Sequence, residues 1–166
     1  MRYFHTIFIL AGLVLSSSLA LTGQTKYGVK VETSKPAGLT AAKTYVWAVG
    51  RPSPDKDIDR MIVAAIDREL AAHGLAKRPA APGDLAVTYT SLNRTDVDVS
   101  SDKSREASAP FNVGTLVVDV SNSASRESLY RVRMDTPIDR NPTTLEAEIG
   151  AAVKAMFETY AQPVKR

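Results

Sequence analysis

The sequence predicts an α+β domain in which a single mixed or antiparallel β-sheet of about five strands carries two helices packed on one face. Two observations lead to this fold class. Five segments alternate apolar and polar residues, as half-buried strands do, and two longer segments repeat apolar residues every three or four positions, as amphipathic helices do. Their order is β-β-α-β-β-β-α, and this segregation of strands from helices favours one sheet covered on one side.

The first two strands are expected at residues 27–33 and 43–48. In the first, Val29 and Val31 alternate with charged residues, and the second is rich in aromatic and β-branched residues, which favour strands. Residues 34–38 contain a proline and a glycine and are expected to form the loop between them.

The first helix is expected between Ser53 and Gly74. Ser53 would be the N-cap, and Pro54 would occupy the first helical position, where its missing N–H has no consequence. Apolar residues then recur at helical spacing from Ile58 to Leu70. Gly74 would end the helix in the left-handed conformation.

The remaining strands follow a connector over 77–83, which holds two prolines. The third strand is expected over 84–99 and is followed by a polar loop over 100–110. The fourth and fifth strands are expected at 113–120 and 130–134, where one face of each is apolar.

The second helix is expected to start at Asn141-Pro142, a capping residue followed by a proline, and to end at Pro163. Its apolar residues recur from Leu145 to Tyr160. Because two helices cover only one face of the sheet, the other face is expected to meet water or a partner.

Residues 1–23 are expected to form a cleavable signal peptide, and 24–166 a single α+β domain. Arg2 precedes an apolar run over 7–15, and small residues follow that run, which is the pattern of a secretory signal. The run is shorter than the roughly 20 apolar residues of a spanning helix. The mature protein is therefore expected to be periplasmic or secreted, with an uncleaved anchor as the alternative.

Cleavage after Ala20 and cleavage after Gly23 both fit the pattern. Leu21-Thr22-Gly23 is similar to the front half of a bacterial lipobox, but Gln24 stands where the lipid-bearing cysteine would be. The chain has no cysteine, so no lipid anchor of this kind is expected. The same absence excludes thiol catalysis, thiolate metal sites and disulfides.

The charges of the chain argue against a nucleic-acid partner. Lys and Arg number 21 against 18 Asp and Glu, and the two signs are interspersed along the sequence. Nucleic-acid-binding domains usually carry a basic stripe or patch, and the sequence shows none.

Several short motifs occur in an order and spacing that resemble a known family. They are Tyr45-Val46-Trp47-Ala48, Ile62 to Ile66 with Leu70 and Gly74-Leu75, Asp84 to Tyr89, Gly114 to Asp119, Ile149 to Val153, and Pro163. The family is DUF4136, a domain of unknown function in bacterial exported proteins, many of them lipoproteins. The resemblance implies an envelope protein of undefined role and supplies no catalytic residues.

The chain departs from that family at two places. Many members carry a lipobox cysteine where this chain has Gln24, which puts lipid anchoring in doubt. Many also carry Trp-Arg-Gly in the fifth strand, where this chain has Tyr130-Arg131-Val132.

No catalytic constellation, metal site or cofactor motif is predicted. His73 is the one histidine after residue 23, and the sequence lacks a Gly-x-Ser-x-Gly elbow; a cationic residue closing a helix explains it more simply. Asp96, Asp98 and Asp102 lie close in sequence, but they lack the glycine and the final glutamate of a calcium loop. We therefore expect a non-enzymatic protein.

The open sheet face is the first candidate binding surface. It would carry polar residues from three strands: Thr88, Thr90, Asp119, Arg131 and Arg133. Arg131 and Arg133 project on the same side, so they would either form cross-strand ion pairs or make a fork for an anionic ligand. The leading hypothesis is a non-catalytic binding or assembly module for an unknown envelope macromolecule.

A pocket between sheet and helices is the second candidate. It would be lined by Trp47, Tyr89, Tyr130 and Phe157, for which core packing is the alternative. This arrangement would suit a periplasmic carrier of a small apolar or anionic ligand. A hydrolase using His73 is a third reading, and the sequence leaves the partner and the oligomeric state open.

Overall fold

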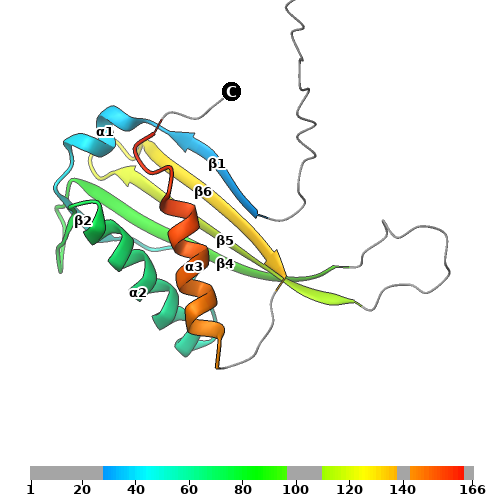
Figure 1. Ribbon diagram of the computed structural model, residues 1–166. Helices are drawn as coiled ribbons and strands as arrows, with labels where there is room; N and C mark the ends of the chain where they lie inside the picture. Colours follow the sequence, from blue (N-terminus) through cyan, green and yellow to red (C-terminus); the bar gives the residue numbers. More distant parts are fainter. Residues whose placement is uncertain (1–27, 97–109, 138–142, 163–166) are drawn as a thin grey trace, which may run out of the picture.

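One β-sheet and three helices make up the part of the chain that the structure describes (Figure 1). The structure is a computed structural model, and it describes residues 28–96, 110–137 and 143–162. The elements are, in chain order, β1 (Gly28–Ser34), α1 (Pro36–Ala41), β2 (Thr44–Trp47), α2 (Lys56–Ala72), β3 (Ala76–Lys77), β4 (Leu85–Asp96), β5 (Phe111–Asn122), β6 (Ser128–Pro137) and α3 (Leu145–Phe157).

The strands lie in the order β1-β6-β5-β4-β2-β3. The first four are antiparallel neighbours, whereas β2 runs parallel to both β4 and β3, so the sheet is mixed. Within the described residues, no helix combines the length and the apolar character needed to span a bilayer.

The α+β class and the single sheet are confirmed, but the described residues form six strands rather than about five, and three helices rather than two. Both additional elements are short. Helix α1 forms where a loop was expected, because Pro36 presets a helical φ and Leu39 is buried in the core. Strand β3 pairs with β2 over two residues at the start of the expected connector.

The cap of α2 corrects one sequence prediction. Asp55, not Ser53, is the N-cap: its Oδ1 accepts from the backbone N–H of Asp57 at 3.0 Å and of Ile58 at 3.3 Å. Ser53 is buried instead, and its N–H donates to the hydroxyl of Tyr89 at 3.2 Å.

The end of α2 is as predicted. Gly74 has φ +82°. The N–H of Leu75 donates to the carbonyl of Leu70, and that of Gly74 to Ala71, which is the pair of bonds of a Schellman motif. The chain therefore leaves α2 in a defined direction, toward β3.

Several expectations fall outside the described residues. They are the signal peptide over 1–23, the third strand beyond Asp96, the loop over 100–109, the helix start at Asn141-Pro142, and Pro163.

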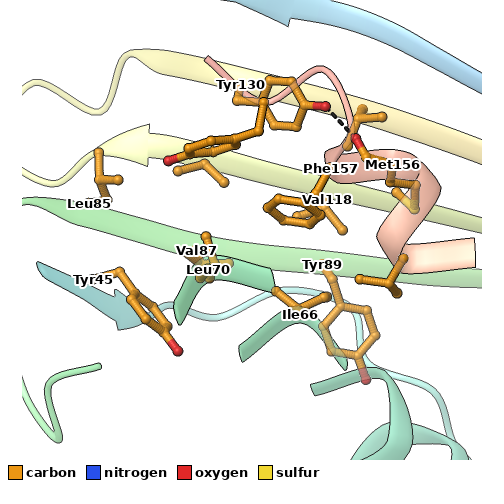
Figure 2. Close-up of a cluster of buried hydrophobic side chains, with 14 of the residues drawn as sticks. Tyr45, Ile66, Leu70, Leu85, Val87, Tyr89, Val118, Tyr130, Met156 and Phe157 are labelled. Atoms are coloured by element: carbon orange, nitrogen blue, oxygen red, sulfur yellow. Dashed lines mark hydrogen bonds between the residues drawn. The ribbon is translucent and has the colours of Figure 1, made fainter. Parts of the chain in front are cut away.

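Helices α2 and α3 pack side by side on one face of the sheet and cover the core (Figure 1). Ile66 and Leu70 of α2 and Met156 and Phe157 of α3 are buried against β4, β5 and β6 (Figure 2). The hydroxyl of Tyr130 donates to the carbonyl of Met156, which ties β6 to the end of α3 (Figure 2). The core therefore lies between the sheet and the carboxyl-terminal halves of both helices.

Candidate ligand-binding groove

The sheet face beneath the helices changes character along its strands. The antiparallel register places Tyr89, Val118 and Val132 in one row across β4, β5 and β6, and all three are buried. Two rows further along, the same face presents Asn93, Gly114 and Thr136. Large apolar side chains thus give way to small or polar ones on one continuous face.

Between these rows lies a transitional row formed by Ser91, Leu116 and Met134. Leu116 and Met134 are only half-buried, although they pack against the core cluster. Apolar side chains at this position therefore remain accessible from outside the molecule.

The helices are too short to cover the whole sheet. The 12 residues of β4 extend about 40 Å, whereas the 17 residues of α2 and the 13 of α3 extend about 25 and 20 Å. Both helices start on the side of the sheet where β4 and β6 end and β5 begins. These strand ends run past the starts of the helices (Figure 1). The first turns of the helices therefore stand over the rows of small residues.

A groove of about 540 Å³ results from this arrangement. We call it the α2–α3 groove, and its apolar walls are formed by Ile58 and Ile62 of α2, Leu145 and Ile149 of α3, and Leu116 and Met134 of the sheet. Its volume lies in the range of roughly 300–1,000 Å³ that is common for small-molecule sites. Most of its lining is aliphatic, so it would favour an apolar ligand.

The polar part of the groove lining is almost entirely uncharged. Ser91, Asn93 and Thr136 line it from the sheet, and Glu148 is the one charged side chain among the described lining residues. Glu148 is exposed on α3. The groove therefore offers no described cation to an anionic ligand.

Of the four aromatic residues expected to line a pocket, Tyr89, Tyr130 and Phe157 belong to the core, and the half-buried Trp47 packs against it. None of the four lines the groove. The rings of Tyr130 and Phe157 are 0% and 1% exposed and lie 6.0 Å apart between centroids. Trp47 and Tyr89 meet edge to face at 6.1 Å. Burial, together with a hydrogen bond to Asp59, raises the pKa of Tyr89 to about 12.

The five residues expected on the open face all lie on the side of the sheet away from α2 and α3, because they alternate with core residues. Thr88, Asp119 and Arg131 are direct cross-strand neighbours on β4, β5 and β6. Thr90 and Arg133 lie in the next row.

Both arginines of the open face bind carboxylates of the chain itself. Arg131 Nη1 lies 2.9 Å from Asp119 Oδ2, and its Nε lies 2.8 Å from Glu32 Oε2. Arg133 binds Asp135 through Nε at 2.6 Å and Nη2 at 3.0 Å. Arg131 therefore pairs across strands with Asp119 of β5 and Glu32 of β1, whereas Arg133 pairs with Asp135 along β6. Exposed pairs of this kind contribute about 0–1 kcal/mol each. An anionic ligand would have to displace these carboxylates.

Asp135 is the most strongly perturbed carboxylate of this face. The guanidinium of Arg133 is the main reason that the pKa of Asp135 lies well below its usual range, and hydrogen bonds from Thr115 and Arg94 add to the effect. Arg94 Nη1 donates to Asp135 Oδ1 at 2.8 Å. The same pairing raises the pKa of Arg133.

The remaining sequence candidates do not form a reactive cluster. His73 is the C-cap of α2, and its ring packs against Tyr160 with 4.6 Å between centroids. Asp96 ends β4, whereas Asp98 and Asp102 lie outside the described residues. In the part of the chain that the structure describes, no three His, Cys, Asp or Glu residues are grouped to hold a metal.

The polar residues of the groove were not predicted because they lie on a strand face that the apolar residues before them assign to the core. On β4, the face that carries Val87 and Tyr89 continues with Ser91 and Asn93, and on β6 the face that carries Met134 continues with Thr136. This change from apolar to polar within one phase is a signal that the sequence does contain.

A family model gives the comparison that decides the family. It matches residues 29–160 and is described as "Domain of unknown function (DUF4136)". The chain belongs to the DUF4136 family. Among curated proteins, none matches this DUF4136 chain in sequence.

Solved structures with a similar fold include two of the PelC dodecamer from Paraburkholderia phytofirmans. Each aligns with a TM-score of 0.54 at 11% identity, covering 83% of the DUF4136 chain and 98% or 99% of PelC. A minor lipoprotein from Acinetobacter baumannii aligns with a TM-score of 0.44 at 8% identity, covering 73% of this chain and 94% of that one. At these identities, the PelC alignments show a shared fold alone.

Proposed function

We propose that this DUF4136 chain is an exported, non-catalytic binding protein that holds a small apolar or amphipathic ligand in the α2–α3 groove. The observation that carries the proposal is the groove itself: about 540 Å³ of space bounded by aliphatic side chains at the surface. Export rests on the signal-peptide pattern of residues 1–23.

Two features of the fold support a site here rather than a packing defect. The groove lies where both helices begin, so its walls come from regular elements that the packed core holds in place. The apolar residues that line it, such as Leu116 and Ile149, would gain from burial by a ligand at about 25 cal/mol per Å² of apolar surface.

The test is a titration of the purified protein with N-phenyl-1-naphthylamine, an uncharged fluorophore whose emission rises in apolar surroundings. We expect the unmodified chain to bind it saturably. Ala152 lines the groove, so Ala152→Phe would fill part of it and weaken binding by about tenfold or more. Ala147→Phe is the matched control, because Ala147 is exposed on the same helix and is not among the groove-lining residues.

A second blocking variant guards against misfolding of the first. Ser91→Leu fills the groove from the sheet side, and circular dichroism would verify that each variant is folded. Absence of saturable binding by the unmodified chain would refute the proposal, as would equal binding by Ala152→Phe and Ala147→Phe.

Native mass spectrometry of the protein recovered from its own envelope would identify the natural occupant. A few hundred daltons of extra mass that disappear on denaturation would indicate a bound small molecule. A stoichiometric second protein or glycan, with the groove empty, would favour the macromolecule-binding module instead.

An assembly function is the second candidate, and the edge strand β1 favours it. Within the described residues, β1 pairs only with β6, and Val29 is 40% exposed. Such edges can take up a strand from another chain. PelC, which shares the fold, is described as a dodecamer. Light scattering would show an oligomer that Val29→Lys dissociates; a monomeric unmodified chain would remove this candidate.

A further inference from the structure

The outer end of the α2–α3 groove is built from uncharged hydrogen-bonding groups. Asn93, Gly114 and Thr136 are direct cross-strand neighbours on β4, β5 and β6, so the amide and the hydroxyl flank a position without a side chain. Ser91 adds a second hydroxyl on the same face of β4. Together these residues form a shallow polar floor with an open centre.

These polar groups are available to a ligand. The hydroxyl of Thr136 donates to the carbonyl of Pro137 at 3.3 Å and keeps its acceptor lone pairs. Within the described residues, the side chains of Ser91 and Asn93 make no hydrogen bond. An amide and two hydroxyls supply both donors and acceptors, which suits a ligand group that also has both.

Charge around the groove disfavours an anion. Glu148 lines it, whereas Asp57 in the first turn of α2 is neutralised by an ion pair with Arg60 at 2.9 Å. The arginines at the same end of the sheet, Arg94 and Arg133, belong to the opposite face and bind Asp135 there.

The apolar part of the groove has the character of a site for a flexible chain. No aromatic residue occurs among its described lining residues, so a flat ring system gains no stacking contact there and binds through apolar burial alone, as an aliphatic chain does. Leu116, Met134 and Ile149 instead offer aliphatic surface next to the polar floor.

We infer that the occupant of the groove is an uncharged amphiphile: an aliphatic chain lies against Leu116, Met134 and Ile149, and a hydroxyl-bearing head contacts Asn93 and Thr136. This inference rests on the proposed function and adds the chemical class of the ligand. It distinguishes a neutral lipid-like molecule from a fatty acid, which has a similar chain but a carboxylate head.

Monolauroylglycerol and laurate test the inference, because they share one acyl chain and differ in the head. Each would be used below its micelle concentration at pH 8 to displace N-phenyl-1-naphthylamine from the purified protein. We expect monolauroylglycerol to displace the probe at a concentration about tenfold lower than laurate.

Two charge reversals on different faces of α3 provide the matched comparison. Glu148→Lys should improve laurate binding about tenfold and leave monolauroylglycerol nearly unchanged, because Glu148 lines the groove. Glu146→Lys makes the same charge change at an exposed position that is not among the lining residues, so its effect should be much smaller.

The possible failures can be told apart. If the probe does not bind the unmodified chain, both the proposed function and this inference are wrong. If the probe binds but laurate displaces it as well as monolauroylglycerol does, or better, the groove binds ligands and only the uncharged-head inference is wrong. An equal response of laurate to the two charge reversals would also overturn it.

Discussion

Asp67 on α2 joins three elements, and its removal should be among the most damaging single changes outside the apolar core. Its Oδ1 accepts from the hydroxyl of Tyr45 at 2.7 Å and from the indole N–H of Trp47 at 2.9 Å. Its Oδ2 accepts from the ammonium of Lys77 at 2.8 Å. The carboxylate therefore holds β2 and β3 against α2.

The expected magnitude for Asp67→Ala is a loss of about 3 kcal/mol in the free energy of unfolding. Tyr45 is 1% exposed, and leaving its buried hydroxyl without an acceptor costs about 1–3 kcal/mol. Trp47 would lose a bond to a charged acceptor, which is worth about 1.5–3 kcal/mol when buried and less at this half-buried position. The exposed Lys77 pair adds about 0–1 kcal/mol.

Urea unfolding followed by circular dichroism measures this loss. With a slope of about 2 kcal/mol per molar, the midpoint of Asp67→Ala should fall by about 1.5 M. Asp67→Asn keeps an oxygen acceptor for Tyr45 and Trp47, so its loss should stay below about 1 kcal/mol. Equal midpoints for the two variants would refute the reasoning. In a Tyr45→Phe background, Asp67→Ala should cost less, because no tyrosine hydroxyl is left unpaired.

Asp135→Asn should lower stability by about 1–2 kcal/mol at pH 7, because the ion pairs with both Arg133 and Arg94 are lost. The pKa of Asp135 is lower in the folded state than in the unfolded state, so its carboxylate stabilises the fold above the unfolded pKa of about 4, and this stabilisation is lost as pH falls. The melting temperature of the variant should therefore decline less between pH 7 and pH 2 than that of the unmodified chain. Gly50→Ala should destabilise by about 2 kcal/mol or more in urea, because its Cβ would lie 2.3 Å from the carbonyl oxygen of Tyr89. Gly150→Ala should instead raise the melting temperature through a gain of about 0.5–1 kcal/mol, because Gly150 is inside α3 and its Cβ would meet only a flexible side-chain end; a lower melting temperature would contradict this.

Local patterns predicted the long elements because each follows from neighbours in sequence. The apolar spacing of α2 and its glycine ending at Gly74 depend on residues within a few turns. The prediction of Ser53 as the N-cap is wrong because both Ser53 and Asp55 are good capping residues. The choice between them depends on Tyr89, which is distant in sequence and whose hydroxyl accepts from the N–H of Ser53. Short elements such as β3 were missed because two residues carry no periodic signal.

The candidate pocket shows the same division. Trp47, Tyr89, Tyr130 and Phe157 were expected to line a pocket between sheet and helices. Three of them are packed core, and Trp47 packs against that core at a half-buried position. Sequence pattern identifies which face a side chain takes, whereas filled space depends on how side chains from distant segments fit together.

The sequence by itself determined the α+β class, the faces of the strands and the positions of the two long helices, because alternation and helical spacing are local properties. The register and the overlap of the layers were decided only by the tertiary structure. Asn93, Gly114 and Thr136 come from three separate segments, and antiparallel pairing brings them into one row. The groove exists because long strands extend past shorter helices at that row, and this mismatch is a property of how the layers pack rather than of any one segment.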